Sequence, residues 1–185
     1  LGCSAEEVAA ICARVAAGTG QVVSPANYNS PQQTVIAGDS AAVAAACEGA
    51  RENGAQKVVD LPVSAPFHCA LMAPAAEKLK GEMATVSFRS PSPPVVTNVE
   101  AAPNADAARI PELLIAQVTA PVRFTEMMQR LKADGVTHFL EVGAGRVLTG
   151  LLARIDRRSK RKSLGAVSDL ENARNFIAEA RGVLS

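Results

Sequence analysis

Residues 21–38 read QVVSPANYNSPQQTVIAG, and this stretch decides how the first part of the chain folds. Two runs rich in β-branched residues, Val22-Val23 and Thr34-Val35-Ile36, lie on either side of Ser30-Pro31, a pair that is typical of turns. The stretch therefore predicts two strands joined by a turn, with Gly38 at the end of the second strand.

A helix is expected on each side of these two strands. Ser4 and Glu7 have the spacing of a capping box, and apolar residues then repeat at helical intervals, which predicts a helix over residues 5–17. An alanine-rich segment predicts a second helix over residues 41–52. After it, a β-branched run predicts another strand over residues 57–61.

The order helix-strand-strand-helix-strand is that of a β-α-β-β-α-β ferredoxin-like unit without its opening strand. We expect the opening strand to lie upstream of Leu1. The alternative is an independent α+β domain with a three-stranded sheet. The first interpretation divides the chain into a ferredoxin-like small subdomain, residues 1–61, and a second part, residues 62–185.

The second part is predicted to alternate helices with short apolar strands. The pattern predicts helices over residues 74–84, 109–118, 123–134 and 147–155, a last helix after a capping box of Ser168 and Glu171, and strands over residues 95–98, 138–142 and 162–167. Such alternation is typical of a mostly parallel sheet covered by helices, so the fold class is α/β.

Composition and charge exclude several classes of protein. A hydrophobic fraction of 48% and a charged fraction of 20% in 185 residues indicate a packed protein rather than a disordered one. The net charge of +1 supplies no global field for nucleic acid or an anionic membrane. One Tyr, five Phe and no Trp argue against a module that stacks bases on aromatic rings. The longest charge-free stretch, residues 15–38, is too polar to span a bilayer.

The cysteines and histidines do not have the spacing of a metal site. Cys3, Cys12, Cys47 and Cys69 form no C-x-x-C pair, and we expect reduced thiols in a cytoplasmic protein. The chain's two histidines are 70 positions apart, so no metal ion is expected.

His68 is the residue that position singles out for chemistry. It follows the predicted strand 57–61 and a proline-containing loop, and loops after strands carry the reactive groups of many α/β folds. Histidine can accept and return a proton near neutral pH, although a single loop histidine can equally be structural or solvated. Cys69 beside it is expected to be a buried, unreactive thiol.

Four segments resemble malonyl-CoA:acyl-carrier-protein transacylases, and they follow one another in the same order as in that family. They are residues 27–38 (NYNSPQQTVIAG), 61–72 (LPVSAPFHCALM), 117–124 (QVTAPVRF) and 141–150 (EVGAGRVLTG). The resemblance covers essentially the whole chain. It implies that residues 62–185 are the C-terminal part of an α/β-hydrolase-like acyltransferase large subdomain.

The resemblance also implies a reaction and roles for three residues. In the family a serine takes the malonyl group from malonyl-CoA as an ester and passes it to the phosphopantetheine thiol of acyl carrier protein, without a cofactor. Position by position, His68 is the general base and acid, and Gln117 is the residue whose main-chain carbonyl orients the imidazole. Asn29 is a substrate-side residue, unless it only satisfies backbone groups in a turn. Phe67 resembles the pattern of malonyl-selective members.

The nucleophile of that family is absent from the sequence. No serine has glycine both two residues before it and two residues after it, so there is no nucleophile elbow. The family's Gly-Gln-Gly segment and its malonate-binding arginine also have no counterpart. We expect all three to precede Leu1, and we expect the 185 residues to be inactive alone. The alternatives are an acyltransferase fragment of a polyketide synthase and a non-catalytic ferredoxin-like binding module.

Two further features have competing interpretations. Gly143-Ala144-Gly145 lies between a predicted strand and a helix, but Leu148 occupies the place of the third glycine of a dinucleotide motif, which favours close packing over cofactor binding. The basic residues between Arg157 and Lys162 are either a docking patch for an acidic carrier protein or a solvated helix end. The sequence leaves the oligomeric state open.

Overall fold

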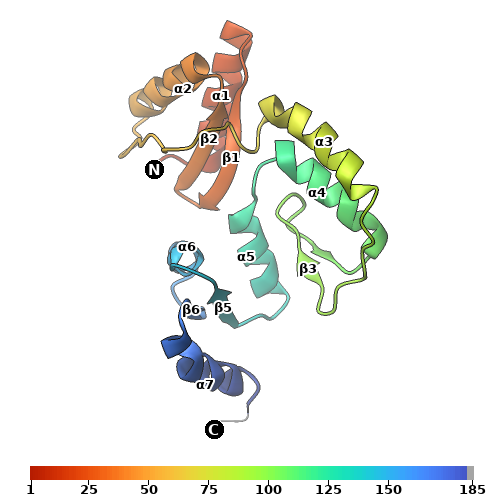
Figure 1. Cartoon of the computed structure of the whole chain (residues 1–185). Coiled ribbons are helices and arrows are strands. Elements are labelled where there is room, and N and C mark those ends of the chain that lie inside the picture. The colour runs from red at the N-terminus through yellow and green to blue at the C-terminus, as the bar shows by residue number, and fades with distance from the viewer. Residues whose placement is uncertain (183–185) are drawn as a thin grey trace. The chain divides into compact units, whose positions relative to one another are not determined.

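The computed structural model describes residues 1–182, which divide into two compact units (Figure 1). The first unit is residues 1–127, and the second begins at Met128. The division at residue 61 that the sequence predicts differs from this boundary, and it remains a prediction.

The first unit contains most of the regular structure. Its elements are α1 (Ala5–Thr19), β1 (Val23–Ser30), β2 (Gln33–Gly38), α2 (Ser40–Glu52), η1 (Ala70–Met72), α3 (Ala73–Met83), β3 (Val95–Val96), β4 (Pro103–Asn104), η2 (Ala107–Arg109), α4 (Ile110–Thr119) and the start of α5 (Phe124–Ala133). The second unit holds the end of α5, then β5 (His138–Val142), α6 (Val147–Ile155), β6 (Lys160–Leu164), η3 (Val167–Asp169) and α7 (Leu170–Ala180).

The predicted hairpin and the helices on each side of it are confirmed. β1 and β2 pair antiparallel, with Val23 opposite Gly38 and Ser30 opposite Gln33. The capping box of α1 is present, since the Glu7 amide donates to Ser4 Oγ at 3.2 Å and the Ser4 amide donates to Glu7 Oε2 at 2.7 Å. The core of this region is formed by Ile11, Cys12, Val23, Ala42 and Ala46.

Gly38 permits the tight passage from β2 into α2. A Cβ atom at this position would lie 2.0 Å from the Val22 carbonyl oxygen, so no other residue fits without a backbone shift. The Asp39 amide donates to that oxygen at 2.7 Å, and the Val22 amide donates to Asp39 Oδ2 at 2.8 Å. Asp39 therefore ties the two strands' ends together rather than capping α2 with its side chain.

The predicted strand over residues 57–61 is wrong. These residues form neither helix nor strand, and among the described residues they have no ladder partner. The Lys57 main chain bonds with Leu1 instead, and Val59 and Leu61 are 55% and 51% exposed. β-branched residues favour a strand only where a neighbouring strand is available to pair with them.

The remaining helices of the first unit begin close to where the sequence predicts. α3 and α4 each carry proline in the first turn, at Pro74 and Pro111, where the missing amide costs no helical hydrogen bond. The two helices pack against each other, and the short β3–β4 hairpin lies between them in sequence.

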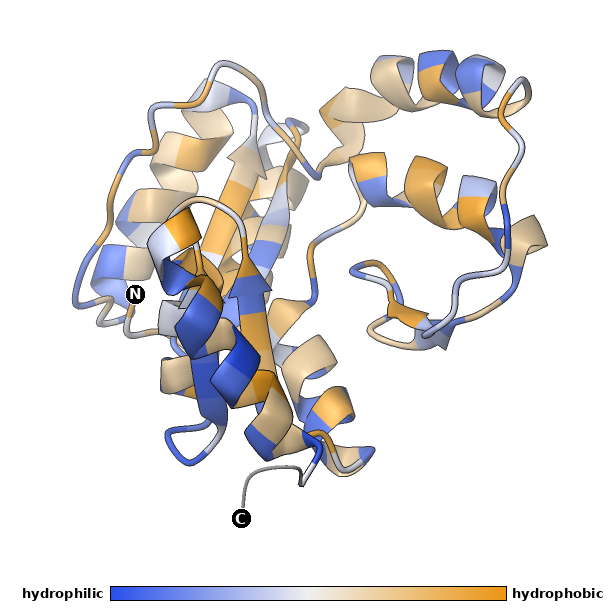
Figure 2. Ribbon diagram, turned by 60° about the horizontal axis from the view of Figure 1, so that its bottom comes forward, coloured by the Kyte–Doolittle hydropathy of each residue, from blue (hydrophilic) through white to orange (hydrophobic). Residues whose placement is uncertain are grey.

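The mostly parallel sheet predicted for residues 62–185 is found only in part: β5 and β6 pair parallel, whereas β3, at the start of the strand predicted over residues 95–98, pairs antiparallel with β4, and the last strand ends at Leu164 instead of residue 167. β5 and β6 run parallel, with His138 opposite Lys160, and α6 connects them. Figure 2 shows hydrophilic β6 beside a largely hydrophobic β5. The predicted capping box of Ser168 and Glu171 is wrong. The Asp169 carboxylate instead accepts from the amides of Gly165 and Ala166, so α7 begins at Leu170.

The four cysteines are free thiols. Within residues 1–182, no helix has the length and apolar character needed to cross a bilayer.

Candidate active site

His68 sits in a strained turn two residues before the start of η1. Its φ angle is 62°, in the left-handed region that costs a residue with a Cβ atom about 1–2 kcal/mol. The thiol of buried Cys69 donates to the Pro66 carbonyl at 3.1 Å, and the Phe67 amide donates to the Ala65 carbonyl at 3.0 Å. The loop thus holds His68 in a conformation that is costly for a residue with a Cβ atom. Strain of this kind is concentrated at functional sites.

The imidazole of His68 is anchored by the end of α4. Its Nδ1 atom lies 2.9 Å from the main-chain oxygen of Gln117. Gln117 is in the last turn of α4, where carbonyls lack a helical donor, and the residue four positions later is Pro121, which has no amide proton. The Gln117 oxygen is therefore available to accept a hydrogen bond from Nδ1–H, which fixes the tautomer with the lone pair on Nε2.

The other ring nitrogen of His68 is open. Nε2 has no hydrogen-bond partner among the described residues, and it is not one of the buried polar atoms that lack a partner. His68 as a whole is half-buried. The Nδ1 edge of the ring is thus fixed by the protein, and solvent reaches the basic Nε2 atom on the other edge.

The Gln117 side chain stiffens the same corner. Its Nε2 donates to the Ala120 carbonyl at 2.8 Å and lies 3.5 Å from His68 Nδ1, while its Oε1 is buried without a partner among the described residues. The Gln117 side chain thus links the end of α4 to Ala120, next to the carbonyl that holds His68. The sequence-based pairing of His68 with the Gln117 carbonyl is present in the geometry, while the catalytic role remains a prediction.

A second contact brings β1 to the segment after α4. The Tyr28 amide donates to the Val122 carbonyl at 2.9 Å, and the Val122 amide donates to the Ala26 carbonyl at 2.8 Å. Asn29 follows on β1 and is half-buried. No hydrogen bond among residues 1–182 joins Asn29 to His68, and a substrate-side role for Asn29 stays a prediction.

Arg123 holds the segment after α4 in place, a role that the sequence pattern does not reveal. Its guanidinium forms an ion pair with Glu126 and donates to the Val99 and Glu100 carbonyls at 3.4 and 3.2 Å. The hydrogen bond from Arg123 lowers the pKa of Glu126, although burial acts against it. Burial raises the pKa of Tyr28, so the phenol stays protonated.

The glycine turn after β5 is not an anion site in this structure. The Glu141 carboxylate accepts from the Leu148 and Thr149 amides at 3.0 and 2.7 Å, so the chain's own anion occupies the start of α6. Burial raises the pKa of Glu141, but the hydrogen bonds from Thr149 and the helix amides outweigh it and hold the pKa below its usual value. No group of three potential metal ligands is found in residues 1–182.

The basic cluster is partly neutralised inside the second unit. Lys160 pairs with Glu179, and Arg161 donates to the carbonyls of Arg157 and Ser159. A docking role for this cluster stays a prediction.

Comparison with known sequences identifies relatives over nearly all of the chain. The family model of the acyl transferase domain matches residues 4–176. The malonyl CoA-acyl carrier protein transacylase of Salmonella typhimurium is 50% identical over 136 residues, which are 74% of this chain and 44% of that protein. The Bacillus subtilis transacylase is 44% identical over 160 residues, 86% of this chain and 50% of that protein. The chain spans about half the length of the curated relatives it matches.

Solved structures agree with the sequence comparison. FabD from Acinetobacter baumannii has a TM-score of 0.92 at 38% identity, over 97% of this chain and 57% of that chain. A malonyl-transacylase solved in complex with a type II polyketide synthase acyl-carrier protein has a TM-score of 0.90 at 40% identity, over 94% of this chain and 55% of that chain. The resemblance inferred from four sequence segments and the α/β acyltransferase fold class are confirmed. With a family match that runs from residue 4 to residue 176, the chain belongs to the acyl transferase domain family.

Proposed function

We propose that this chain carries the proton-transfer half of a malonyl-CoA:acyl-carrier-protein transacylase, with His68 as the general base and acid. The single observation that carries the proposal is the 2.9 Å contact between His68 Nδ1 and the Gln117 carbonyl oxygen, which leaves Nε2 basic and open. The transacylases of Salmonella typhimurium and Bacillus subtilis, which are similar over most of the chain, supply the substrate class.

The first half-reaction forms a seryl ester. A serine hydroxyl gives its proton to Nε2 of His68 while its oxygen bonds to the thioester carbonyl carbon of malonyl-CoA. The carbon–sulfur bond then breaks, and the coenzyme A sulfur takes the proton back from Nε2. The second half-reaction reverses these steps, with the phosphopantetheine thiol of acyl carrier protein as the attacking group and the serine oxygen as the leaving group.

The Gln117 carbonyl replaces the carboxylate of a serine-histidine-aspartate triad. A carbonyl oxygen fixes the imidazole tautomer through one hydrogen bond but adds no full negative charge. Because Gln117 lies in the last turn of α4, the partial negative charge of the helix end also stabilises the imidazolium formed during transfer.

The 185 residues do not provide the attacking serine, since none of their serines lies in a nucleophile elbow. Under this proposal the hydroxyl comes from a part of the transacylase that these residues do not include. The 185-residue chain incubated with malonyl-CoA is therefore expected to show no stable malonyl adduct by intact-mass measurement. A stable ester on this polypeptide would contradict the assignment.

A chimera tests the role of His68 directly. The matched residues of the Bacillus subtilis transacylase are replaced by the corresponding residues of this chain, and malonyl transfer to acyl carrier protein is measured. His68→Ala is expected to lower kcat by about 10²–10⁴-fold, the usual contribution of a positioned acid/base. His138→Ala, which removes the chain's other histidine, is the matched control and is expected to retain transfer. Full transfer by the His68→Ala chimera would refute the proposal.

A further inference from the structure

Cys69 connects the strained turn at His68 to the helical segment that follows it. Cys69 is only 1% exposed. Its thiol donates to the Pro66 carbonyl at 3.1 Å, and its own carbonyl accepts from the Met72 amide of η1 at 3.0 Å. Cys69 is therefore fixed both to the residue before the turn and to the helical turn after it.

The turn places His68 in a conformation that residues with a side chain rarely adopt. Phe67 and His68 are the two central residues of the turn, and His68 has a φ of 62°. Turns with a positive φ at this position usually have glycine or asparagine there. A strained residue keeps such a conformation only where the surrounding contacts hold it.

The hydrogen bond of the Cys69 thiol spans the strained residue. It joins residue 69 to residue 66, so His68 cannot return to a negative φ unless this bond breaks or both of these residues move. η1, which begins after Cys69, contacts α4, and the last turn of α4 carries the Gln117 carbonyl. The backbone of the turn and the partner of the imidazole are therefore both tied to α4.

A change of φ at His68 would displace its imidazole, because the Cβ atom rotates with the backbone. Nδ1 now lies 2.9 Å from the Gln117 oxygen. A displacement of about 1 Å is enough to break a hydrogen bond of this length, and a catalytic group misplaced by this distance can cost about 100-fold in rate. The bond of the Cys69 thiol therefore bears on both the tautomer of His68 and the position of its basic nitrogen.

We infer that Cys69 is a positioning residue for His68. Its thiol, bonded to the Pro66 carbonyl, keeps His68 at a positive φ, so that Nδ1 meets the Gln117 carbonyl and Nε2 stays open. Cys69 acts through the backbone and not through a contact with the reacting atoms. Its effect on malonyl transfer rests on the function proposed for His68, whereas its effect on the tautomer does not.

Nitrogen-15 NMR of the uniformly labelled 185-residue chain tests the effect on the tautomer. At about pH 9, Cys69→Ala is expected to reduce the rings of His68 that carry the proton on Nδ1 from nearly all to a minority. Cys69→Ser keeps a donor of similar size and is expected to retain the Nδ1 proton. An unchanged Nδ1 proton in Cys69→Ala would overturn the inference, and so would an equal loss in Cys69→Ser, because packing alone would then explain the effect.

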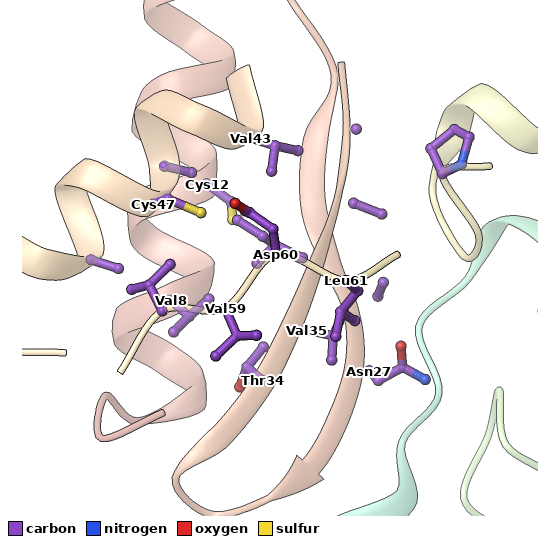
Figure 3. Close-up of a pocket in the computed structure, with 18 of the residues that line it drawn as sticks. Val8, Cys12, Asn27, Thr34, Val35, Val43, Cys47, Val59, Asp60 and Leu61 are labelled. Carbon is purple, nitrogen blue, oxygen red and sulfur yellow. The ribbon is translucent and has the colours of Figure 1, made fainter. Parts of the chain in front are cut away.

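Cys12→Ala is the matched control for the loss of a buried thiol. Cys12 is also 1% exposed, and its side chain lies on α1 beside Cys47 of α2 (Figure 3). It belongs to the core cluster of these helices, in which Cys69 has no part. Cys12→Ala is therefore expected to leave the Nδ1 proton of His68 in place, and its loss in this variant would overturn a specific role of Cys69.

Malonyl transfer by the Bacillus subtilis chimera tests the effect on the reaction. Cys69→Ala is expected to lower kcat by about tenfold or more and to change KM by less than about twofold, since the imidazole is displaced while the substrate contacts are kept. Cys69→Ser and Cys12→Ala are expected to stay within about threefold of the unsubstituted chimera. In a His68→Ala background, Cys69→Ala is expected to cause no further loss.

The outcomes separate the role of Cys69 from the proposed function. If His68→Ala leaves transfer intact, the proposed function fails, and the tautomer in Cys69→Ala still decides whether Cys69 positions the ring. If His68→Ala lowers kcat and Cys69→Ala does not, only the positioning role is overturned. A further loss of about tenfold in the double variant would show that Cys69 does not act through His68, which would also overturn the inference.

Discussion

The left-handed backbone at His68 predicts an unusual order of stability for two substitutions. His68→Gly and His68→Ala both remove the hydrogen bond to the Gln117 carbonyl, so that loss cancels when the two variants are compared. They differ in strain, because alanine at a φ of 62° keeps a cost of about 1–2 kcal/mol that glycine does not have. The greater freedom of unfolded glycine offsets about 0.4–1 kcal/mol of this difference.

His68→Gly is therefore expected to be about 0.8 kcal/mol more stable than His68→Ala, from the midpoints of the two ranges, which is the reverse of the usual order of the two residues. Urea unfolding followed by circular dichroism measures the difference, which corresponds to about 0.3–0.5 M in the midpoint. Cys69 is the matched control. Its φ is −138°, so Cys69→Ala is expected to be more stable than Cys69→Gly. Equal or greater stability of His68→Ala would refute the strain at this position.

Three further predictions concern other parts of the chain. The folded pKa of Glu141 lies below its unfolded value, so the ionised group stabilises the fold above about pH 4 and loses this effect as pH falls. In urea unfolding, the stability advantage of the native chain over Glu141→Gln should be smaller at about pH 3 than at about pH 7, and an unchanged advantage would contradict the capping role. Burial raises the pKa of Cys12 to about 11, so about one thiol in a thousand is ionised at about pH 8. Iodoacetamide should therefore label Cys12 much faster in urea than in the folded chain, and equal rates would show that the thiol is accessible in the folded chain. Arg123→Ala should lower the free energy of unfolding by about 1 kcal/mol because its hydrogen bonds are lost, and Arg123→Lys should restore less than half of this loss. Full restoration by lysine would show that the several donors of the guanidinium are not needed.

The elements that the sequence predicts correctly are those set by local signals. Ser4 and Glu7 determine the start of α1 without any help from the rest of the fold. The helix predicted over residues 147–155 has the same bounds in the structure, because an apolar stripe follows a glycine turn that cannot be helical. Residues 57–61 fail for the opposite reason, since a strand needs a partner and local β-propensity does not reveal whether one is present.

The candidate site divides in a similar way. The pairing of His68 with the Gln117 carbonyl came from family resemblance, yet a physical signal for it was in the sequence. Pro121 lies four residues after Gln117 and removes the amide that would otherwise bond to its carbonyl. The left-handed conformation of His68 had no such signal, because histidine, unlike glycine, does not mark a positive φ. The positions of Arg123 and Val122 depend on tertiary contacts and could not be read from their neighbours in sequence.

The proposed function requires that the Gln117 carbonyl hold His68 with its proton on Nδ1 and its lone pair on Nε2. Nitrogen-15 NMR of the uniformly labelled chain tests this most directly, since the chain has two histidines and a His68→Gln variant assigns their signals. At about pH 9, where imidazole side chains are generally neutral, His68 is expected to show a protonated Nδ1 and an unprotonated Nε2. A His68 ring that carries its proton on Nε2 under these conditions would contradict it.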